Sequence, residues 1–178
     1  MAQLQLENLQ LENSSISTTS PDWSRESLDC WWHPGAQLLR AIRNYQRWRD
    51  RQGMVGFCLR KLNFIHVLQH RFWSVVTGAD IPLNSQIGGG LLLVHPNGIV
   101  IHPQARIGVN CLIFQQVTIV KGVTIGGNVD IGAGAKIIRP VAIGDRAQIG
   151  ANAVVTHDVP PGATVVGIPA RIINTQSL

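Results

Sequence analysis

The sequence lacks three features that would place the protein in a membrane or outside the cell. No apolar run reaches the roughly 18 residues that a membrane-spanning helix needs. The first 15 residues, MAQLQLENLQLENSS, contain neither a basic start nor an apolar core, so we expect no secretory signal peptide. The chain has only 3 cysteines, and a small odd number does not predict a disulfide framework. We therefore expect a reduced, cytoplasmic protein.

Acidic residues are also scarce. The chain has 10 Asp and Glu against 15 Lys and Arg, which gives a formal net charge of +5. Between residues 35 and 73 a single acid accompanies the basic residues Arg40, Arg43, Arg47, Arg49, Arg51, Arg60, Lys61 and Arg71. Such a cluster fits a solvated helix face, and it also fits contact with a membrane surface or an acidic polymer. No nucleic-acid-binding motif accompanies it, so we expect no nucleic-acid partner.

What the sequence has instead is a six-residue repeat. Every sixth residue is Ile or Val, at Ile101, Ile107, Ile113, Ile119, Ile125, Ile131, Ile137, Ile143, Ile149 and Val155. Four residues after each comes a small or β-branched residue, at Ala105, Cys111, Val117, Val123, Val129, Ala135, Val141, Ala147, Ala153 and Val159. Neither the helix nor the strand period explains a strict six, whereas one flat side of a three-sided coil does. The repeat predicts a parallel β-helix with about eighteen residues per turn, strands about 4.8 Å apart and a buried Cys111 thiol.

The residues before the repeat have helical spacing. A first helix is expected from Gly35 to the break at Gly53, with an apolar face of Leu38, Leu39, Ile42, Tyr45 and Trp48. A second is expected from about Met54 to Val76, with an apolar face of Val55, Cys58, Leu59, Leu62, Ile65, Leu68, Phe72 and Val75. His66 and His70 have metal-ligand spacing, but no Cys, Asp or Glu joins them, so we expect structural histidines. We thus divide the chain into a flexible tail (1–21), a helical region (22–78) and a β-helix with a C-terminal extension (79–173).

The repeat has one irregularity. The sixes at Ile81, Ile87, Leu93 and Ile99 are out of phase by two residues with those from Ile101 on. A two-residue insertion within LVHPNGIVIHP would break one corner of the coil and push side chains outward. His95 lies in this insertion, and a histidine at an open corner can act as a general base near neutral pH. Asp80 lies 15 residues earlier, close to one coil, so it could orient the His95 ring. The alternatives are a structural corner residue for His95 and a cap for Asp80.

The stretch from Asp80 to Ile173 resembles the catalytic domain of serine O-acetyltransferases, which are hexapeptide-repeat acyltransferases. The resemblance rests on DIPLNSQIGGGLLLVHPNGIV, on IGAGAKI and on the closing GIPAR. It implies a mainly β fold, a left-handed parallel β-helix preceded by a short helical region. It further implies that His95 is the general base of an acetyl transfer to serine, a step of cysteine biosynthesis, and that Asp80 is its partner.

The same resemblance implies the partners of the reaction. Acetyl-CoA would be the cosubstrate and would lie in a groove between neighbouring subunits of a homotrimer, with no metal ion. Ala133 and Ala151 would line this groove, and Lys136, Ala170 and Arg171 would contact the phosphates or the pantetheine arm.

Three departures from that family keep a second acceptor open. Val94 replaces the acid that usually precedes the histidine, and IVKGVTIGG lacks the loop that carries an Arg-His pair. The helical region is also shorter. The alternative is therefore a sugar or polysaccharide O-acetyltransferase of the same fold. A zinc carbonic anhydrase of this fold would need three histidines, and the spacing of His95, His102 and His157 does not suit that site. A non-catalytic binding module, with the basic helices as its functional surface, is the remaining alternative.

Overall fold

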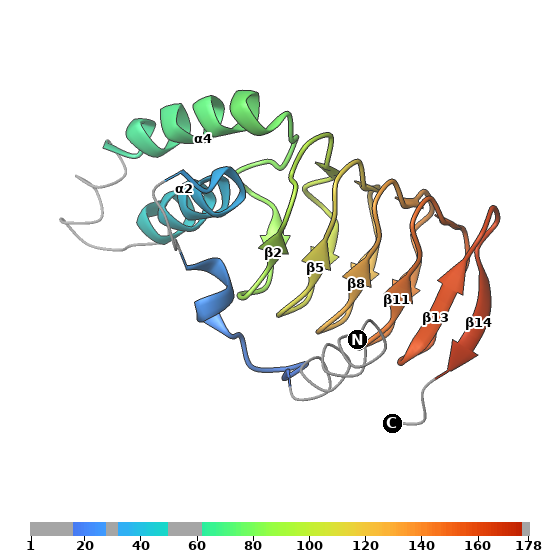
Figure 1. The fold of residues 1–178 in the computed structure, drawn as a ribbon. Coiled ribbons are helices and arrows are strands. Elements are labelled where there is room, and N and C mark those ends of the chain that lie inside the picture. The colour runs from blue at the N-terminus through green and yellow to red at the C-terminus, as the bar shows by residue number, and fades with distance from the viewer. Residues whose placement is uncertain (1–15, 28–31, 50–61, 176–178) are drawn as a thin grey trace, which may run out of the picture.

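The computed structural model describes residues 16–27, 32–49 and 62–175. A short 3-10 helix, η1 (Trp23–Glu26), precedes two α-helices, α2 (Pro34–Arg49) and α4 (Phe64–Thr77). Short strands follow, and they stack along one axis (Figure 1). They are β1 (Gln86–Ile87), β2 (Leu92–Leu93), β3 (Val100–Ile101), β4 (Arg106–Ile107), β5 (Leu112–Ile113), β6 (Thr118–Ile119), β7 (Thr124–Ile125), β8 (Asp130–Ile131), β9 (Lys136–Ile137), β10 (Ala142–Ile143), β11 (Gln148–Ile149), β12 (Val154–Val155), β13 (Ala163–Val166) and β14 (Arg171–Thr175). None of the helices in these ranges is long and apolar enough to cross a bilayer.

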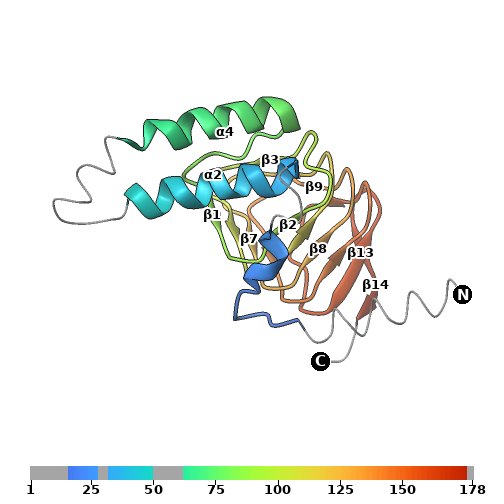
Figure 2. The same ribbon diagram turned by 60° about the vertical axis from the view of Figure 1, so that its left-hand side comes forward.

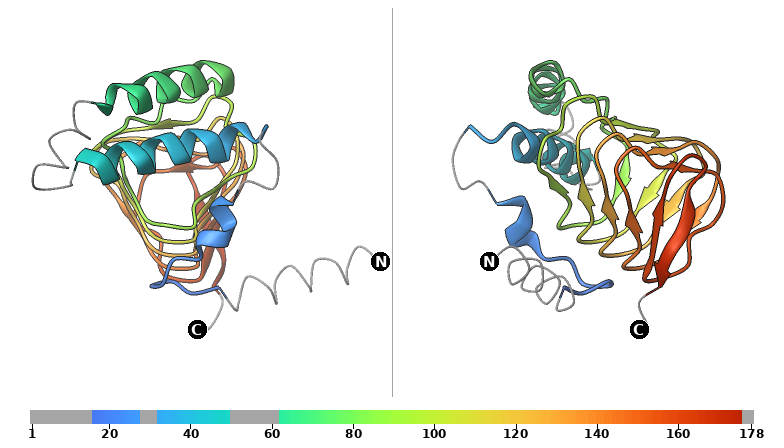
Figure 3. Two further views of the ribbon diagram at one scale, coloured as in Figure 1. Left: turned by 90° about the vertical axis from the view of Figure 1, so that its left-hand side faces the viewer. Right: turned by 45° about the vertical axis from the view of Figure 1, so that its right-hand side comes forward.

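The strands form the three sides of a prism. The sheet orders are β1-β4-β7-β10, then β2-β5-β8-β11-β13-β14, and finally β3-β6-β9-β12. All pairs are parallel except the last, β13 with β14. Viewed along the coil axis, the chain outlines a triangle (Figure 3). This is the parallel β-helix that the repeat predicts, with the left hand that the resemblance implies.

The repeat positions fill the interior of the prism. All ten branched residues from Ile101 to Val155 are buried, and so are the ten smaller residues that follow them by four positions. The out-of-phase set is buried as well, from Ile81 at 0% exposed to Ile87 at 9%. The expected inward face of the repeat is confirmed. Each side of the triangle therefore contributes one large and one small residue to a narrow, close-packed core.

The first coil is two residues longer than those after it. Leu92 pairs with Leu112, a step of 20 residues, whereas Leu112 pairs with Asp130, a step of 18. Beyond the insertion the register returns to 18, because Val100 pairs with Thr118. The expected two-residue insertion is confirmed.

The helices pack as a hairpin over the start of the β-helix (Figure 2). On α2 the predicted inward face is confirmed in Leu38, Leu39 and Ile42, which are at most 2% exposed. The predicted apolar face of the second helix is exposed within the described residues, at Leu62 just before α4 and at Ile65, Leu68, Phe72 and Val75 on it. The rest of that predicted helix, including Val55, Cys58 and Leu59, lies outside the described residues.

The opposite face of α4 makes the contacts within the chain. His66 is 7% exposed and packs edge-on to Trp48 of α2, with ring centroids 4.4 Å apart. Asn63 donates from Nδ2 to the Tyr45 carbonyl at 3.1 Å, and the His70 Nε2 atom lies 2.8 Å from the Ile81 carbonyl oxygen. Helical periodicity reveals that an apolar face exists, but it does not tell which face packs inside the chain.

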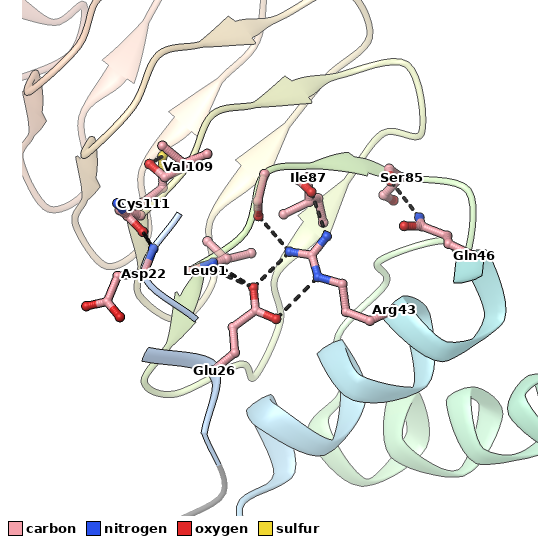
Figure 4. Close-up of polar contacts among 12 residues, drawn as sticks. Asp22, Glu26, Arg43, Gln46, Ser85, Ile87, Leu91, Val109 and Cys111 are labelled. Carbon is pink, nitrogen blue, oxygen red and sulfur yellow. Dashed lines mark hydrogen bonds and ion pairs between the residues drawn. The ribbon is translucent and has the colours of Figure 1, made fainter. Parts of the chain in front are cut away.

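One ion pair fastens α2 to the first coil (Figure 4). Arg43 contacts Glu26 through Nη2 at 2.8 Å, and it donates to the Ile87 and Gly88 carbonyls at 2.6 Å. Glu26 also accepts from the backbone N–H groups of Gly90 and Leu91. A single guanidinium thus joins η1, α2 and the turn between β1 and β2.

We expect that Arg43→Met lowers the free energy of unfolding by about 1.5–3 kcal/mol, because two carbonyls and a carboxylate lose a charged donor. Urea unfolding followed by tryptophan fluorescence measures the change. The control is Arg40→Met, an exposed arginine one turn earlier on α2. Equal unfolding midpoints for the two variants would contradict the fastening role.

The chain before η1 runs along the β-helix. Asn110, fully buried, donates from Nδ2 to the Ser17 and Ser20 carbonyls at 2.8 Å, and its Oδ1 accepts from the Asp22 N–H at 2.7 Å. Residues 1–15 lie outside the described residues. The tail expected over residues 1–21 therefore stays a prediction, and the same holds for the other domain boundaries.

Candidate active site

The proposed base stands at the lengthened corner of the first coil. Leu93 pairs with Ile113, and the Gln116 N–H donates to the Asn97 carbonyl at 2.8 Å. Residues 94–96 of the first coil therefore take the place of a single residue in the second coil, Phe114. His95 is the middle residue of this bulge and is exposed. Pro96 keeps the residue before it extended, which supports an outward loop.

Asp80 lies beside the strand that follows this corner. Its backbone forms a parallel bridge with Val100, with Asp80 N–H to Ile99 carbonyl at 2.8 Å and Ile101 N–H to Asp80 carbonyl at 3.0 Å. The coil that separates them has 20 residues, so Asp80 stacks on Val100 and the assumed eighteen-residue offset does not hold at this coil. The Asp80 side chain is exposed, and among the described residues no hydrogen bond joins it to His95. The pairing of the two side chains stays a prediction.

The predicted alanines occupy the same corner in later coils. The hydrogen bond from Gln116 to Asn97 repeats one coil on, from the Gly134 N–H to the Gln115 carbonyl, and again from the Asn152 N–H to the Ala133 carbonyl, each at 2.8 Å. The residues at the corner are thus Asn97, Gln115, Ala133 and Ala151. His95 and both alanines lie along one edge of the prism, with successive coils about 4.8 Å apart.

The remaining predicted residues extend this edge. Lys136 begins β9, three residues after Ala133, and its Nζ donates to the Gln116 carbonyl. The Ala170 N–H donates to the Val154 carbonyl of β12 at 2.8 Å, so the last turn of the chain closes the same side. Arg171 is exposed and donates from Nη1 to the Ala170 carbonyl. Lys136 thus lies on the sheet that contains β9, Ala170 bonds to β12 of that same sheet, and Arg171 begins β14 of the neighbouring sheet.

Sequence reasoning missed Gln115. Its Oε1 atom is buried and has no hydrogen-bond partner among the described residues. The repeat carried a signal for it, since positions 115, 133 and 151 are equivalent and only the first of them is polar.

Cys111 lies in the core just before β5, between β4 and β5, and is a free thiol, as expected. Burial raises its pKa from an ordinary 9.0 to about 11. The sulfur lies 3.2 Å from the Gly126 carbonyl oxygen. The folded state holds the thiol proton more tightly than the unfolded state, so between about pH 9 and 11 the unfolded state binds fewer protons. Stability contributed by this thiol is present below pH 9 and decreases as the pH rises through that window.

We expect that Cys111 does not react with a thiol reagent in the folded protein at pH 8, because the thiolate is the reactive form and the site is closed to solvent. A variant with Cys30→Ser and Cys58→Ser isolates the signal, and absorbance with a disulfide reagent reports it. Rapid reaction should begin only when urea unfolds the chain. Stoichiometric labelling of the folded protein within minutes would contradict the closed site.

The other histidines have separate surroundings. The His102 Nδ1 atom accepts from the Gln104 N–H at 3.1 Å, and the His157 Nδ1 atom lies 2.9 Å from the Thr156 hydroxyl. Within the described ranges of this chain, no group of three or more His, Cys, Asp or Glu side chains is placed to hold a metal ion.

Comparison with known proteins gives a consistent family. No family model matches the chain. The serine acetyltransferase of Synechococcus elongatus is 40% identical over 122 residues, which cover 64% of this chain and 50% of that protein. The serine acetyltransferase of Helicobacter pylori strain J99 is 38% identical over 122 residues, which cover 64% of this chain and 71% of that protein. The chain spans about half the length of the first relatives that it matches.

Solved structures agree. Soybean serine acetyltransferase complexed with serine is 32% identical, with a TM-score of 0.64, and the match covers 80% of this chain and 58% of that one. Serine acetyltransferase from Brucella abortus strain S19, in complex with coenzyme A, is 27% identical with a TM-score of 0.67, covering 82% and 58%. Since the H. pylori relative is matched at 38% identity over 71% of its length, the chain belongs to the serine acetyltransferase family.

Proposed function

We propose that this chain is an acetyl-CoA-dependent O-acetyltransferase that converts L-serine to O-acetylserine. The observation that carries the proposal is the single edge along which His95, Ala133 and Ala151 follow one another. Two structural relatives support the ligands, since one is described as complexed with serine and another as in complex with coenzyme A. The product would enter cysteine biosynthesis, and the compartment would be the cytoplasm.

His95 would act as the general base of a direct transfer. An imidazole nitrogen takes the proton of the serine hydroxyl as its oxygen attacks the acetyl carbonyl carbon. The electron pair of the carbonyl moves onto its oxygen and then returns, which breaks the carbon–sulfur bond. The imidazolium gives its proton to the departing thiolate, so the free base is regenerated. The Asp80 carboxylate would stabilise the imidazolium, and binding of substrate is the step that brings the two side chains together.

The edge would be completed by a second copy of the chain. His95 is exposed and Ala133 is only half-buried, so a single chain leaves one side of an extended ligand open. A closed homotrimer would place a neighbouring prism against each edge and form a groove for acetyl-CoA. Lys136, Ala170 and Arg171 would then contact the cosubstrate from the side of the C-terminal coils.

One observation favours a sugar or polysaccharide as the acceptor instead. β6 ends at Ile119 and β7 begins at Thr124, so only a tight turn joins them. In the family this place carries an Arg-His pair that contacts the amino acid. A neutral polyol would not need those charges, and the arginines of α2 could then face an acidic polymer or a membrane surface.

The test is an acceptor assay that follows free thiol. The purified full-length chain with acetyl-CoA is offered L-serine and, separately, sugars and oligosaccharides. Turnover with serine supports the proposal, and turnover only with a glycan supports the second acceptor. Absence of turnover with every acceptor, in protein that binds coenzyme A, would overturn both.

A further inference from the structure

A polar side chain that the fold does not use lies on the edge of the proposed site. Gln115 follows Asn97 and precedes Ala133 at the same corner. Its Oε1 atom is buried and unpartnered, and among the described residues neither atom of its amide makes a hydrogen bond. An unpaired buried amide oxygen costs free energy, so packing within the chain gives no reason for a glutamine here.

We propose that the Gln115 amide donates a hydrogen bond from Nε2 to the carbonyl oxygen of the acetyl thioester. This inference rests on the proposed function. The developing oxyanion must lie between the acceptor oxygen at His95 and the sulfur of a cosubstrate whose arm passes Ala133 and Ala151. The coil between these residues is that of Gln115. A donor aimed at the place where negative charge develops lowers the barrier more than it strengthens ground-state binding.

Other donors near the corner are already used. The backbone N–H groups of Gln116, Gly134 and Asn152 each bond to a carbonyl of the preceding coil. Lys136 donates to the Gln116 carbonyl. The Asn97 amide faces the other way, since its Nδ2 atom lies 3.3 Å from the position that a Cβ on Gly78 would take. Gln115 therefore offers an unused amide on the coil between base and cofactor, and its oxygen is buried, whereas the neighbouring Gln116 is exposed.

The test compares Gln115→Leu, which keeps the volume and removes the donor, with Gln115→Glu, which replaces the donor by an acceptor. With the acceptor that the wild type uses, kcat should fall roughly a hundredfold in Gln115→Leu and at least as much in Gln115→Glu. Inhibition by free coenzyme A, which has no acetyl carbonyl, should stay within about twofold of wild type. The control is Gln86→Leu, the same change at an exposed position of β1 on another side of the prism, which should leave kcat unchanged.

Three results would overturn the proposal while wild-type turnover stands. The first is a kcat for Gln115→Leu within about twofold of wild type. The second is an unchanged kcat with weaker inhibition by coenzyme A, because the amide would then bind the pantetheine arm. The third is a changed oligomeric mass in light scattering, which would assign Gln115 to a subunit contact. A wild type that binds coenzyme A but transfers no acetyl group overturns the proposed function first, and this inference with it.

Discussion

His95→Asn should lower kcat by about 10²–10⁴-fold, the usual contribution of a positioned general base. Asparagine keeps a hydrogen-bonding side chain at the corner but cannot accept a proton near neutral pH. The corner itself should persist, because the side chain of His95 is exposed and the turn is fixed by the bond from the Gln116 N–H to the Asn97 carbonyl. Steady-state release of free thiol measures the loss, and circular dichroism checks that the fold is retained.

The matched control is His102→Asn on the same coil. His102 accepts the Gln104 N–H through Nδ1, and the asparagine oxygen can replace that acceptor, so kcat should stay near wild type.

Added imidazole should restore part of the activity of His95→Ala, because a free base can enter the emptied corner. Asp80→Asn should lower kcat less than His95→Asn does, since the Asp80 carboxylate acts only through the His95 ring. Turnover of His95→Asn at the wild-type rate would remove His95 from the mechanism.

Ile131→Ala should lower the free energy of unfolding by about 2–5 kcal/mol, the range for deleting a buried Ile side chain. Ile131 is 0% exposed and lies on β8 between Ile113 of β5 and Ile149 of β11. The narrow prism has no second layer of side chains that could move into the cavity. Urea unfolding gives the change, with the slope of the transition used to check that the unfolded states are comparable.

Ile138→Ala is the control for that measurement. Ile138 is 47% exposed just after β9, so the same chemical change should cost less than about 0.5 kcal/mol. An equal loss of unfolding free energy in the two variants would mean that the buried isoleucines of the prism do not dominate stability. Aggregation on truncation of Ile131 would be read separately, by light scattering before the unfolding series.

The β-helix could be predicted because one physical requirement recurs in every coil. Ile119 and Ile137, one coil later, point into the same narrow interior, so the same type of residue is needed at both positions. The six-residue pattern therefore recurs over many coils and can be recognised in the sequence. The insertion at His95 was predictable for the same reason, since a break in a regular register is visible against its neighbours. The corner residues Ala133 and Ala151 inherit their places from that register.

Other features depend on information that periodicity does not contain. The sequence predicts an apolar face on α4 but not which way it points. Leu68 is 62% exposed, because the contact with α2 is made by the aromatic and polar residues on the opposite face. Asp80 stacks on Val100 because the two inserted residues lengthen this coil to 20 residues. The average period of eighteen residues does not predict that partner. The hydrogen bond from the Asn110 side chain to the Ser17 carbonyl joins residues 93 apart, and the local sequence does not predict it.

The lengthened corner has a consequence for how the proposed site could be moved. The coils on either side of residues 94–96 keep their pairing, so the exchange of one residue for three is absorbed within a single turn. A three-residue bulge of this kind could therefore be transferred to an equivalent corner of another coil. Placed at the next corner in place of Phe114, it would carry the imidazole about 4.8 Å down the edge while the core sequence stays as it is. Engineering could therefore change the position of the proposed base along the prism separately from the residue that stands at the corner.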